Sequence, residues 1–124
     1  MECAPYVDFP LFFVQGNTPE IDVAVTDING NPIDLTDADI YLTCKNDPAQ
    51  TDAEALFQLT VGSGITLFDQ VTMPGQFKAI IPAAATQSLS ALLAYLYDCK
   101  IDLDGNLQTV FGGRLVLWSA ITQS

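Results

Sequence analysis

Apolar residues recur at every second position along most of the chain. Ile21, Val23 and Val25, for example, alternate with acidic or small residues. Successive side chains of a β-strand point to opposite faces of a sheet, so this period predicts strands with one buried face. The same period of two is found in residues 38–45, 55–61, 77–81 and 95–103. The chain is therefore predicted to consist mainly of β-strands.

Turn-forming residues separate these strand segments. Asn29-Gly30 supplies the positive φ of a tight turn, and Gly62-Ser63-Gly64 ends another strand. Asp104-Gly105 predicts a type I′ turn inside a hairpin, and Gly112-Gly113 is expected to separate two final strands. The one helical candidate is a short turn near residues 86–92, in which Thr86 is expected to be the capping residue.

Short strands with regularly spaced turns define the expected fold class. About seven to nine short antiparallel strands, with a turn about every ten residues, predict an all-β fold, an Ig-like β-sandwich. A chain of 124 residues is long enough to bury a single core, so one domain is expected over residues 1–124. Residues 1–8 and 119–124 are expected to be terminal arms outside that core.

Two segments, residues 9–14 and 114–118, are apolar on both faces instead of alternating. Such a strand is either central in a sandwich or covered by a partner, because an exposed apolar edge promotes aggregation. The segments therefore predict assembly with other protein surfaces, and a homo-oligomer is expected. The residues expected at that interface are Phe9, Leu11, Phe12, Phe13, Val14, Leu115, Leu117 and Trp118.

The charge balance excludes two classes of partner. Four basic residues stand against fifteen acidic ones, giving a net charge of −11. Nucleic acid is not expected as a partner, because neutralisation of phosphates by Lys and Arg supplies most of that binding energy. A membrane is not expected either, because no polybasic segment, secretory signal or sufficiently long apolar stretch is present. The acidic chain favours docking onto a surface that is locally basic.

The residue types argue against catalysis. The sequence contains no histidine, which excludes His-based triads, His metal sites and the usual general base near neutral pH. Cys3, Cys44 and Cys99 form no CxxC pair and indicate free thiols made in a reducing cytoplasm. Cys44 and Cys99 lie on apolar strand faces and are expected to be buried. We therefore expect no enzyme activity and no cofactor.

Oxygen-bearing side chains offer a weak calcium candidate. Asp27, Asn29, Asn31 and Asp34 supply potential ligands within one short segment. The spacing fails the EF-hand rule, because Pro32 occupies the sixth position, where that loop requires glycine. Asx and Asn-Gly turn chemistry explains the same residues. Asp102, Asp104 and Asn106 at the last hairpin are interpreted in the same way.

Aromatic side chains raise a second alternative. Tyr95, Tyr97 and Trp118 have rings of the kind that stack on sugars, although their strand spacing favours the core or a subunit contact. A calcium- or carbohydrate-binding β-sandwich module is therefore the alternative function.

A set of turn and strand motifs runs along the chain: Gly16-Asn17-Thr18, Asp27 to Thr36, Ala38-Asp39-Ile40, Lys45, Gly75-Gln76-Phe77, Leu89 to Asp98 and Gly113 to Leu117. These motifs resemble those of a known family. The chain is similar to small β-sandwich modules of tailed-phage virions, such as the amino-terminal domain of the baseplate upper protein family. The resemblance covers roughly residues 16–118, while Asp37 and Ala94 stand where the family usually has glycine.

This resemblance implies a non-enzymatic structural protein. It would be made in the host cytoplasm and assembled in many copies into the virion. Its partners would be other capsid or tail subunits, either on the tail and baseplate or on the capsid exterior as a decoration (cement) protein. Family members often continue into a second domain. The family's binding residues are not fixed by motif, so the resemblance assigns no site residue.

Overall fold

A computed structural model describes residues 7–14, 16–46, 49, 51–87 and 94–118. Strands account for most of these residues, and the two helices are short. The strands are β1 (Val7–Asp8), β2 (Leu11–Val14), β3 (Glu20–Ala24), β4 (Asp39–Lys45), β5 (Phe57–Val61), β6 (Gly64–Leu67), β7 (Gln76–Ile80), β8 (Ala94–Leu103) and β9 (Asn106–Trp118). The helices are the 3-10 helix η1 (Asp52–Glu54) and the α-helix α1 (Ala83–Gln87).

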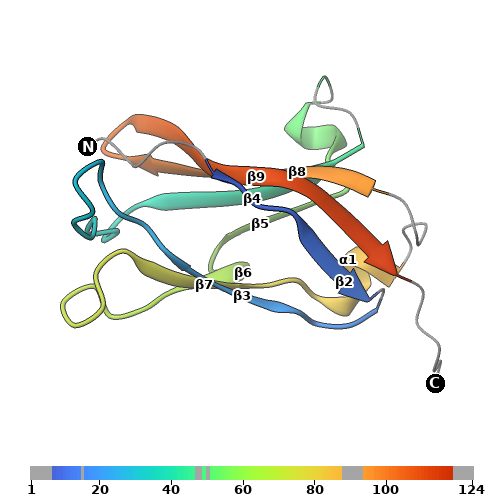
Figure 1. The fold of residues 1–124 in the computed structure, drawn as a ribbon, viewed down its shortest axis with the longest axis horizontal. Helices are drawn as coiled ribbons and strands as arrows, with labels where there is room; N and C mark the ends of the chain where they lie inside the picture. The colour runs from blue at the N-terminus through green and yellow to red at the C-terminus, as the bar shows by residue number, and fades with distance from the viewer. Residues whose placement is uncertain (1–6, 15, 47–48, 50, 88–93, 119–124) are drawn as a thin grey trace.

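All of these strands belong to one curled sheet. Its order is β1-β9-β8-β4-β5-β6-β7-β3, and β2 also pairs with β9. The curl brings β9, β8 and β4 opposite β7 and β3, so the sheet faces itself in two layers (Figure 1). The all-β, sandwich-like class is therefore confirmed. Most pairings are antiparallel as predicted, but β1 and β2 pair with β9, and β5 with β6, in parallel.

The chain passes from one layer to the other at a glycine corner between β5 and β6. Gly62 and Gly64 have φ of 87° and 98°, in the left-handed region that favours glycine. A Cβ on Gly64 would lie 2.8 Å from Leu59 Cδ2, so a larger residue would clash. The predicted strand break at this motif is confirmed, and in the structure it is the place where the sheet curls.

The predicted inward faces form the core. Side chains at the inward positions of residues 38–45, 77–81 and 95–101 are buried, and the two layers bury them against each other. Removal of this apolar surface from water is the main favourable contribution to folding. The largest fully buried apolar side chains are Phe77, Leu35, Ile40, Leu42, Ile65, Ile81, Ile101, Leu115 and Leu117.

The last hairpin joins β8 to β9. Asp104 and Gly105 have φ of 55° and 81°, and Leu103 pairs with Asn106 across them. Two positive φ values in a two-residue loop are typical of the type I′ turn, so this prediction is confirmed.

The expected break at Gly112-Gly113 is wrong, because β9 runs unbroken from Asn106 to Trp118. A Cβ on Gly112 would lie 2.6 Å from the backbone oxygen of Tyr97, so glycine here permits close approach of β8 instead of ending the strand. The irregularity lies nearby at Val110, which the register shift leaves without a partner in β8. This β-bulge explains why the consecutive residues Val110 and Phe111 are both buried.

The short helix begins at Ala83, three residues before the expected start. Thr86 therefore lies inside α1 and does not cap its beginning. Its hydroxyl Oγ1 accepts a hydrogen bond from the Gly16 backbone N–H at 3.2 Å, and its side chain is buried. Thr86 thus connects α1 to the segment between β2 and β3. Residues 88–93 of the predicted helical turn lie outside the described residues.

The described residues share one sheet and one hydrophobic core. Residues 7–8 of the first expected arm are the strand β1, which pairs with β9. The remainder of that arm, and the arm at residues 119–124, lie outside the described residues. Among the described residues, α1 is the longer of the two helices, and neither has the length or apolar content to cross a membrane.

Candidate interaction surface

β1 and β2 line one side of β9 in a single register. Val7 pairs with Phe111 and Leu11 with Leu115, so the same offset holds along both strands. Pro10 has no N–H to donate, which explains the interruption between them. Phe9 bridges this interruption: its N–H donates to the Gly112 oxygen at 2.7 Å, and its own oxygen accepts from the Tyr97 hydroxyl. The edge of the sheet is therefore fixed to both β8 and β9.

Three of the expected interface residues belong to the core. Leu11, Leu115 and Leu117 are buried on the inner face of the sheet. Their segments were interpreted as apolar on both faces, and the period of two places these three leucines inward. They are consequently corrected from interface residues to core residues. Phe13 also points inward and packs half-buried against the core.

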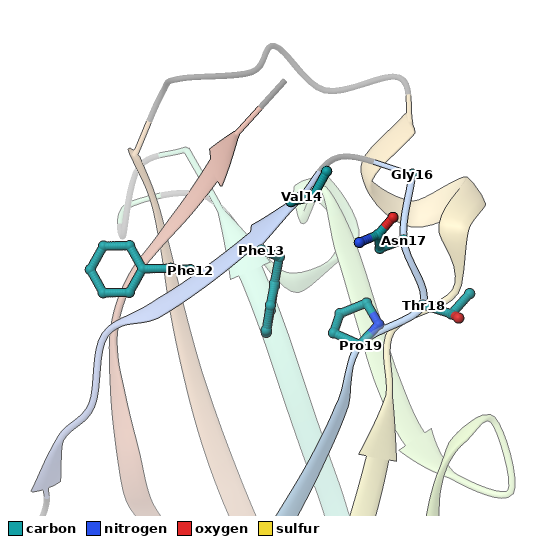
Figure 2. A pocket seen from close by; sticks show the side chains of 7 residues that line it. All are labelled: Phe12, Phe13, Val14, Gly16, Asn17, Thr18 and Pro19. Carbon is teal, nitrogen blue, oxygen red and sulfur yellow. The ribbon is translucent and has the colours of Figure 1, made fainter. Parts of the chain in front are cut away.

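The neighbouring residues on the same strands point outward. Phe12 and Trp118 are 59% and 52% exposed, and Val14 is also exposed. Phe12 pairs with Val116 and Val14 with Trp118, and residues paired in register share a face. Figure 2 shows Phe12 and Phe13 on opposite sides of β2. Leu96 and Arg114, which pair with each other, continue the outward face. We call Phe12, Val14, Leu96, Arg114, Val116 and Trp118 the β2–β9 patch.

A shallow depression lies where β2 leads towards β3 (Figure 2). It has a volume of about 620 Å³ and is lined by Phe12, Phe13, Val14, Gly16, Asn17, Thr18 and Pro19. The Asn17 N–H donates to the Val14 oxygen at 3.1 Å, so this segment is bonded to the end of β2. None of these lining residues is ionisable. The depression therefore suits contact with another surface and offers no acid, base or anionic metal ligand.

The candidate calcium ligands are engaged in turns. Asp27 Oδ1 accepts hydrogen bonds from the backbone N–H groups of Asn29 and Asn31 at 2.9 and 3.0 Å. Asp34 Oδ1 accepts from the Thr36 hydroxyl at 2.6 Å and from its N–H at 2.9 Å, and these bonds lower the pKa of Asp34. Within the part of the chain that the structure describes, no three acidic, Cys or His residues are grouped to hold a metal ion. The turn interpretation fits these contacts.

The candidate sugar-stacking rings do not form a platform. Tyr95 and Tyr97 are buried, and the Tyr97 ring packs edge-on against Phe111 with centroids 6.0 Å apart. Trp118 is the exposed member of the three. A sugar platform needs accessible ring faces, so this arrangement favours the core interpretation for both tyrosines.

The two described cysteines are small core residues. Cys44 and Cys99 are free thiols with no exposed surface. Burial raises the pKa of Cys44 to about 12. Burial, together with the negative charge of Asp98, also raises the pKa of Cys99. A thiol needs its thiolate form to react, so neither residue is suited to nucleophilic chemistry.

The opposite end of the molecule is formed by turns. The segment 25–38, the loop 68–75 and the tip of the β8–β9 hairpin gather there (Figure 1). Gln70 holds this end together: its Oε1 accepts from the N–H groups of Leu35 and Gly75, both at 2.9 Å. Its amide Nε2 donates to the oxygens of Phe68 and Gln76 at 2.8 and 3.1 Å. All four bonds are made to backbone groups, three of them in the turns and one at the start of β7.

Exposed apolar and acidic side chains share this end. Four large apolar residues are exposed on its turns and on the start of β9, and Val71 is 90% exposed. Exposed aspartates lie among them. Sequence reasoning missed this surface, because isolated apolar residues in separate turns carry no periodic signal. We call Ile28, Asp34, Asp37, Asp39, Asp69, Val71, Met73, Asp104 and Leu107 the acidic end.

Neither a comparison with protein-family models nor one with curated proteins finds a match for this chain. The candidate surface therefore has to be interpreted from its own geometry.

Proposed function

We propose that this chain is a non-enzymatic structural protein of a tailed-phage virion, present in many copies on the tail or baseplate or as a capsid decoration protein. The observation that carries the proposal is the β2–β9 patch. Phe12 and Trp118 are more than half exposed on a regular sheet face, beside the depression at the end of β2. Contiguous exposed apolar surface on a small domain typically marks a protein-binding site.

The charge distribution supports assembly. A net charge of −11 keeps free copies apart and in solution. The β2–β9 patch is apolar apart from Arg114, and Asp98 lies next to Leu96 on the same sheet face. This combination suits a subunit that stays dispersed after synthesis and docks later.

A backbone feature supports the family resemblance. Asp37 has φ of 64°, in the left-handed region that glycine adopts most readily. The family usually has glycine at this position, and Asp is among the few other residues that tolerate the conformation. The departure from the family pattern is thus compatible with the same local turn.

The test is fractionation of the native source. Lysate particles are sedimented, washed with salt and analysed by mass spectrometry and cryo-electron microscopy. The chain is expected in the particle fraction at a fixed ratio to the major structural proteins, in symmetric copies at a defined position. A chain that stays in the soluble fraction while the particles sediment would overturn the proposal.

Two variants test whether the chain is incorporated into particles through the β2–β9 patch. Phe12→Asp places a charge on the patch and is expected to prevent incorporation into particles. Val61→Asp is the matched control, because Val61 is an exposed valine on β5, outside both the patch and the acidic end. Incorporation of both variants at equal levels would show that another surface docks.

A further inference from the structure

Strand β3 forms one end of the sheet, and among the described residues it pairs with β7 alone. The Ile81 N–H donates to the Pro19 oxygen at 3.0 Å, and the Val25 N–H donates to the Gly75 oxygen at 2.8 Å. Both bonds continue the antiparallel register of β3 and β7, in which hydrogen-bonded pairs alternate with pairs that are not bonded. Odd-numbered residues of β3 therefore direct their backbone N–H and C=O groups towards β7.

The even-numbered residues of β3 direct their backbone groups to the other side. They are Glu20, Asp22 and Ala24, and all of them are exposed. Within the described part of the chain, no hydrogen bond joins these backbone groups to another residue. An extended segment of another chain can pair with such a row of donors and acceptors as an added strand. We call Glu20, Asp22 and Ala24 the β3 edge.

The charged side chains at the β3 edge are mainly acidic. Lys78 of β7 is opposite Asp22 in the register, and its Nζ lies 3.8 Å from Glu20 Oε1. Lys78 is the one charged residue of β7, and the other three basic residues of the chain belong to β4, β8 and β9 in the other layer (Figure 1). Two carboxylates therefore lie beside one ammonium group. The edge favours a partner strand with basic side chains on this face.

The inner face of β3 adds an apolar requirement. Ile21 and Val23 are half-buried and pack against the core. Side chains of a strand added beside β3 alternate between the two faces of the sheet. Those that point inward would cover Ile21 and Val23, while those that point outward would lie beside the two carboxylates. The complementary segment therefore alternates apolar and basic residues.

A second copy of this chain does not suit the β3 edge. Antiparallel pairing of two such edges through all three residues places Asp22 opposite Asp22 and Glu20 opposite Ala24. Like charges directly opposite each other in adjacent strands are destabilising. The net charge of −11 on each copy opposes the same contact at longer range. The acidic side chains thus protect the edge from self-association and leave it open to a basic strand.

We propose that the β3 edge binds an extended basic segment of another protein by β-strand addition. The segment pairs with the backbone of the edge, with basic side chains beside its two carboxylates and apolar ones beside Ile21 and Val23. This surface is distinct from the β2–β9 patch, because β3 lies at the other end of the sheet order. The inference therefore goes beyond the proposed function and does not depend on a virion role.

Binding of a synthetic peptide to the full chain, followed by amide hydrogen exchange, tests the inference. The probe is a peptide of about seven residues in which lysine and valine alternate, so it presents the same pattern in both directions. In the free protein, the N–H groups of the β3 edge should exchange faster than those of Ile21 and Val23. Peptide at about ten times its dissociation constant should slow exchange at the edge about 10-fold.

Two results of this experiment would overturn the inference. One is the absence of saturable peptide binding, or bound peptide that leaves the amides of the β3 edge unprotected. The other is protection of these amides that rises with protein concentration when no peptide is present, since that indicates a second copy as the occupant.

A control peptide separates strand pairing from charge attraction. The same sequence with methylated backbone nitrogens keeps its positive charge but has no N–H groups to donate to the edge. It is expected to bind about 10-fold more weakly, because strand addition depends on main-chain hydrogen bonds. Equal binding of the two peptides would show charge attraction alone and would overturn the proposal.

Variants of β3 test both parts of the contact. Ala24→Pro removes an outward N–H but no bond to β7, and it should weaken peptide binding about 10-fold. Asp22→Lys should weaken binding about 5-fold or more. Its control is Asp39→Lys, which has the same net charge and alters an exposed aspartate on β4 in the other layer. Equal binding by Asp22→Lys and Asp39→Lys would contradict the site.

Circular dichroism verifies that the variants fold. If Ala24→Pro is unfolded, the two aspartate variants and the methylated peptide still decide the question. The two proposals fail separately. A chain found on particles that does not bind the peptide overturns this inference alone, and a chain that binds the peptide but is absent from particles overturns only the virion role.

Discussion

The β2–β9 edge and the turns held by Gln70 differ in what their side chains contact. In the turns, Gln70 makes four hydrogen bonds to backbone, and Asp27 and Asp34 each accept two. These polar side chains form hydrogen bonds within the turns instead of being available to a partner. In residues 114–118 of β9, the buried leucines Leu115 and Leu117 alternate with side chains that reach solvent. The turns therefore use their polar groups to stabilise the fold, while the edge divides its residues between the core and the exposed face that we propose as a binding surface.

The largest expected effect separates the two faces of β9. Leu117→Ala should lower the free energy of unfolding by about 3–5 kcal/mol, because it removes a fully buried side chain and leaves a cavity. Trp118→Ala, its half-exposed neighbour, should change that free energy by about 1 kcal/mol or less while weakening association. Urea unfolding and sedimentation measure the two quantities. Equal losses of stability would show that Trp118 also belongs to the core.

The second prediction concerns the amide at the centre of the turns. Gln70→Ala should lower the free energy of unfolding by about 2–3 kcal/mol, because the N–H groups of Leu35 and Gly75 lose their acceptor. Gln58→Ala is the matched control, since Gln58 makes a single side-chain bond to Thr43 Oγ1 at 3.0 Å. It should cost about 0.5–1 kcal/mol in the same urea titration. If Gln70→Ala lowers the free energy of unfolding no more than Gln58→Ala does, Gln70 does not hold the turns together.

At alkaline pH, the buried thiol of Cys44 should lower the free energy of unfolding. Below the ordinary thiol pKa of 9.0, Cys44 is neutral whether the chain is folded or unfolded. Between pH 9.0 and about 12, the unfolded chain releases this proton while the folded chain retains it, so stability falls as pH rises. Urea unfolding across this window should show a shallower decline for Cys44→Ala. Identical slopes would mean that Cys44 ionises in the folded protein.

The smallest effect is expected at the strained aspartate of the acidic end. Asp37→Gly should raise stability by about 0.5 kcal/mol, because glycine adopts φ of 64° without a Cβ clash but loses more chain entropy on folding. Asp39→Gly, two residues later on β4, should instead destabilise, since glycine weakens a regular strand. Thermal unfolding of the pair measures both signs. A loss at Asp37 comparable to that at Asp39 would show that the aspartate side chain itself stabilises the turn.

Local patterns predicted much of the fold. Alternation in residues 38–45 and 95–101 identified inward faces that are buried, and Asp104-Gly105 identified its turn type. Each signal depends on a residue and its immediate neighbours. Gly112 was misinterpreted because its role depends on the approach of Tyr97 from another strand.

The β2–β9 patch and the acidic end were only partly predictable, because both depend on contacts between residues that are distant in the sequence. The apolar segments at residues 9–14 and 114–118 were identified, but their parallel register with each other decides which side chains face inward. That register joins residues about a hundred positions apart and leaves no local signal. The acidic end is assembled from three separate turns, and only the curl of the sheet brings them together.

The pairing of β2 with β9 has a consequence for synthesis. The ribosome delivers Leu11 long before Leu115, its partner in the sheet. Throughout that interval the first apolar segment has no native neighbour strand, and contacts between distant parts of a chain form slowly. This edge should therefore be completed last, and nascent chains are most exposed to chaperones or to premature clustering until residue 118 has emerged.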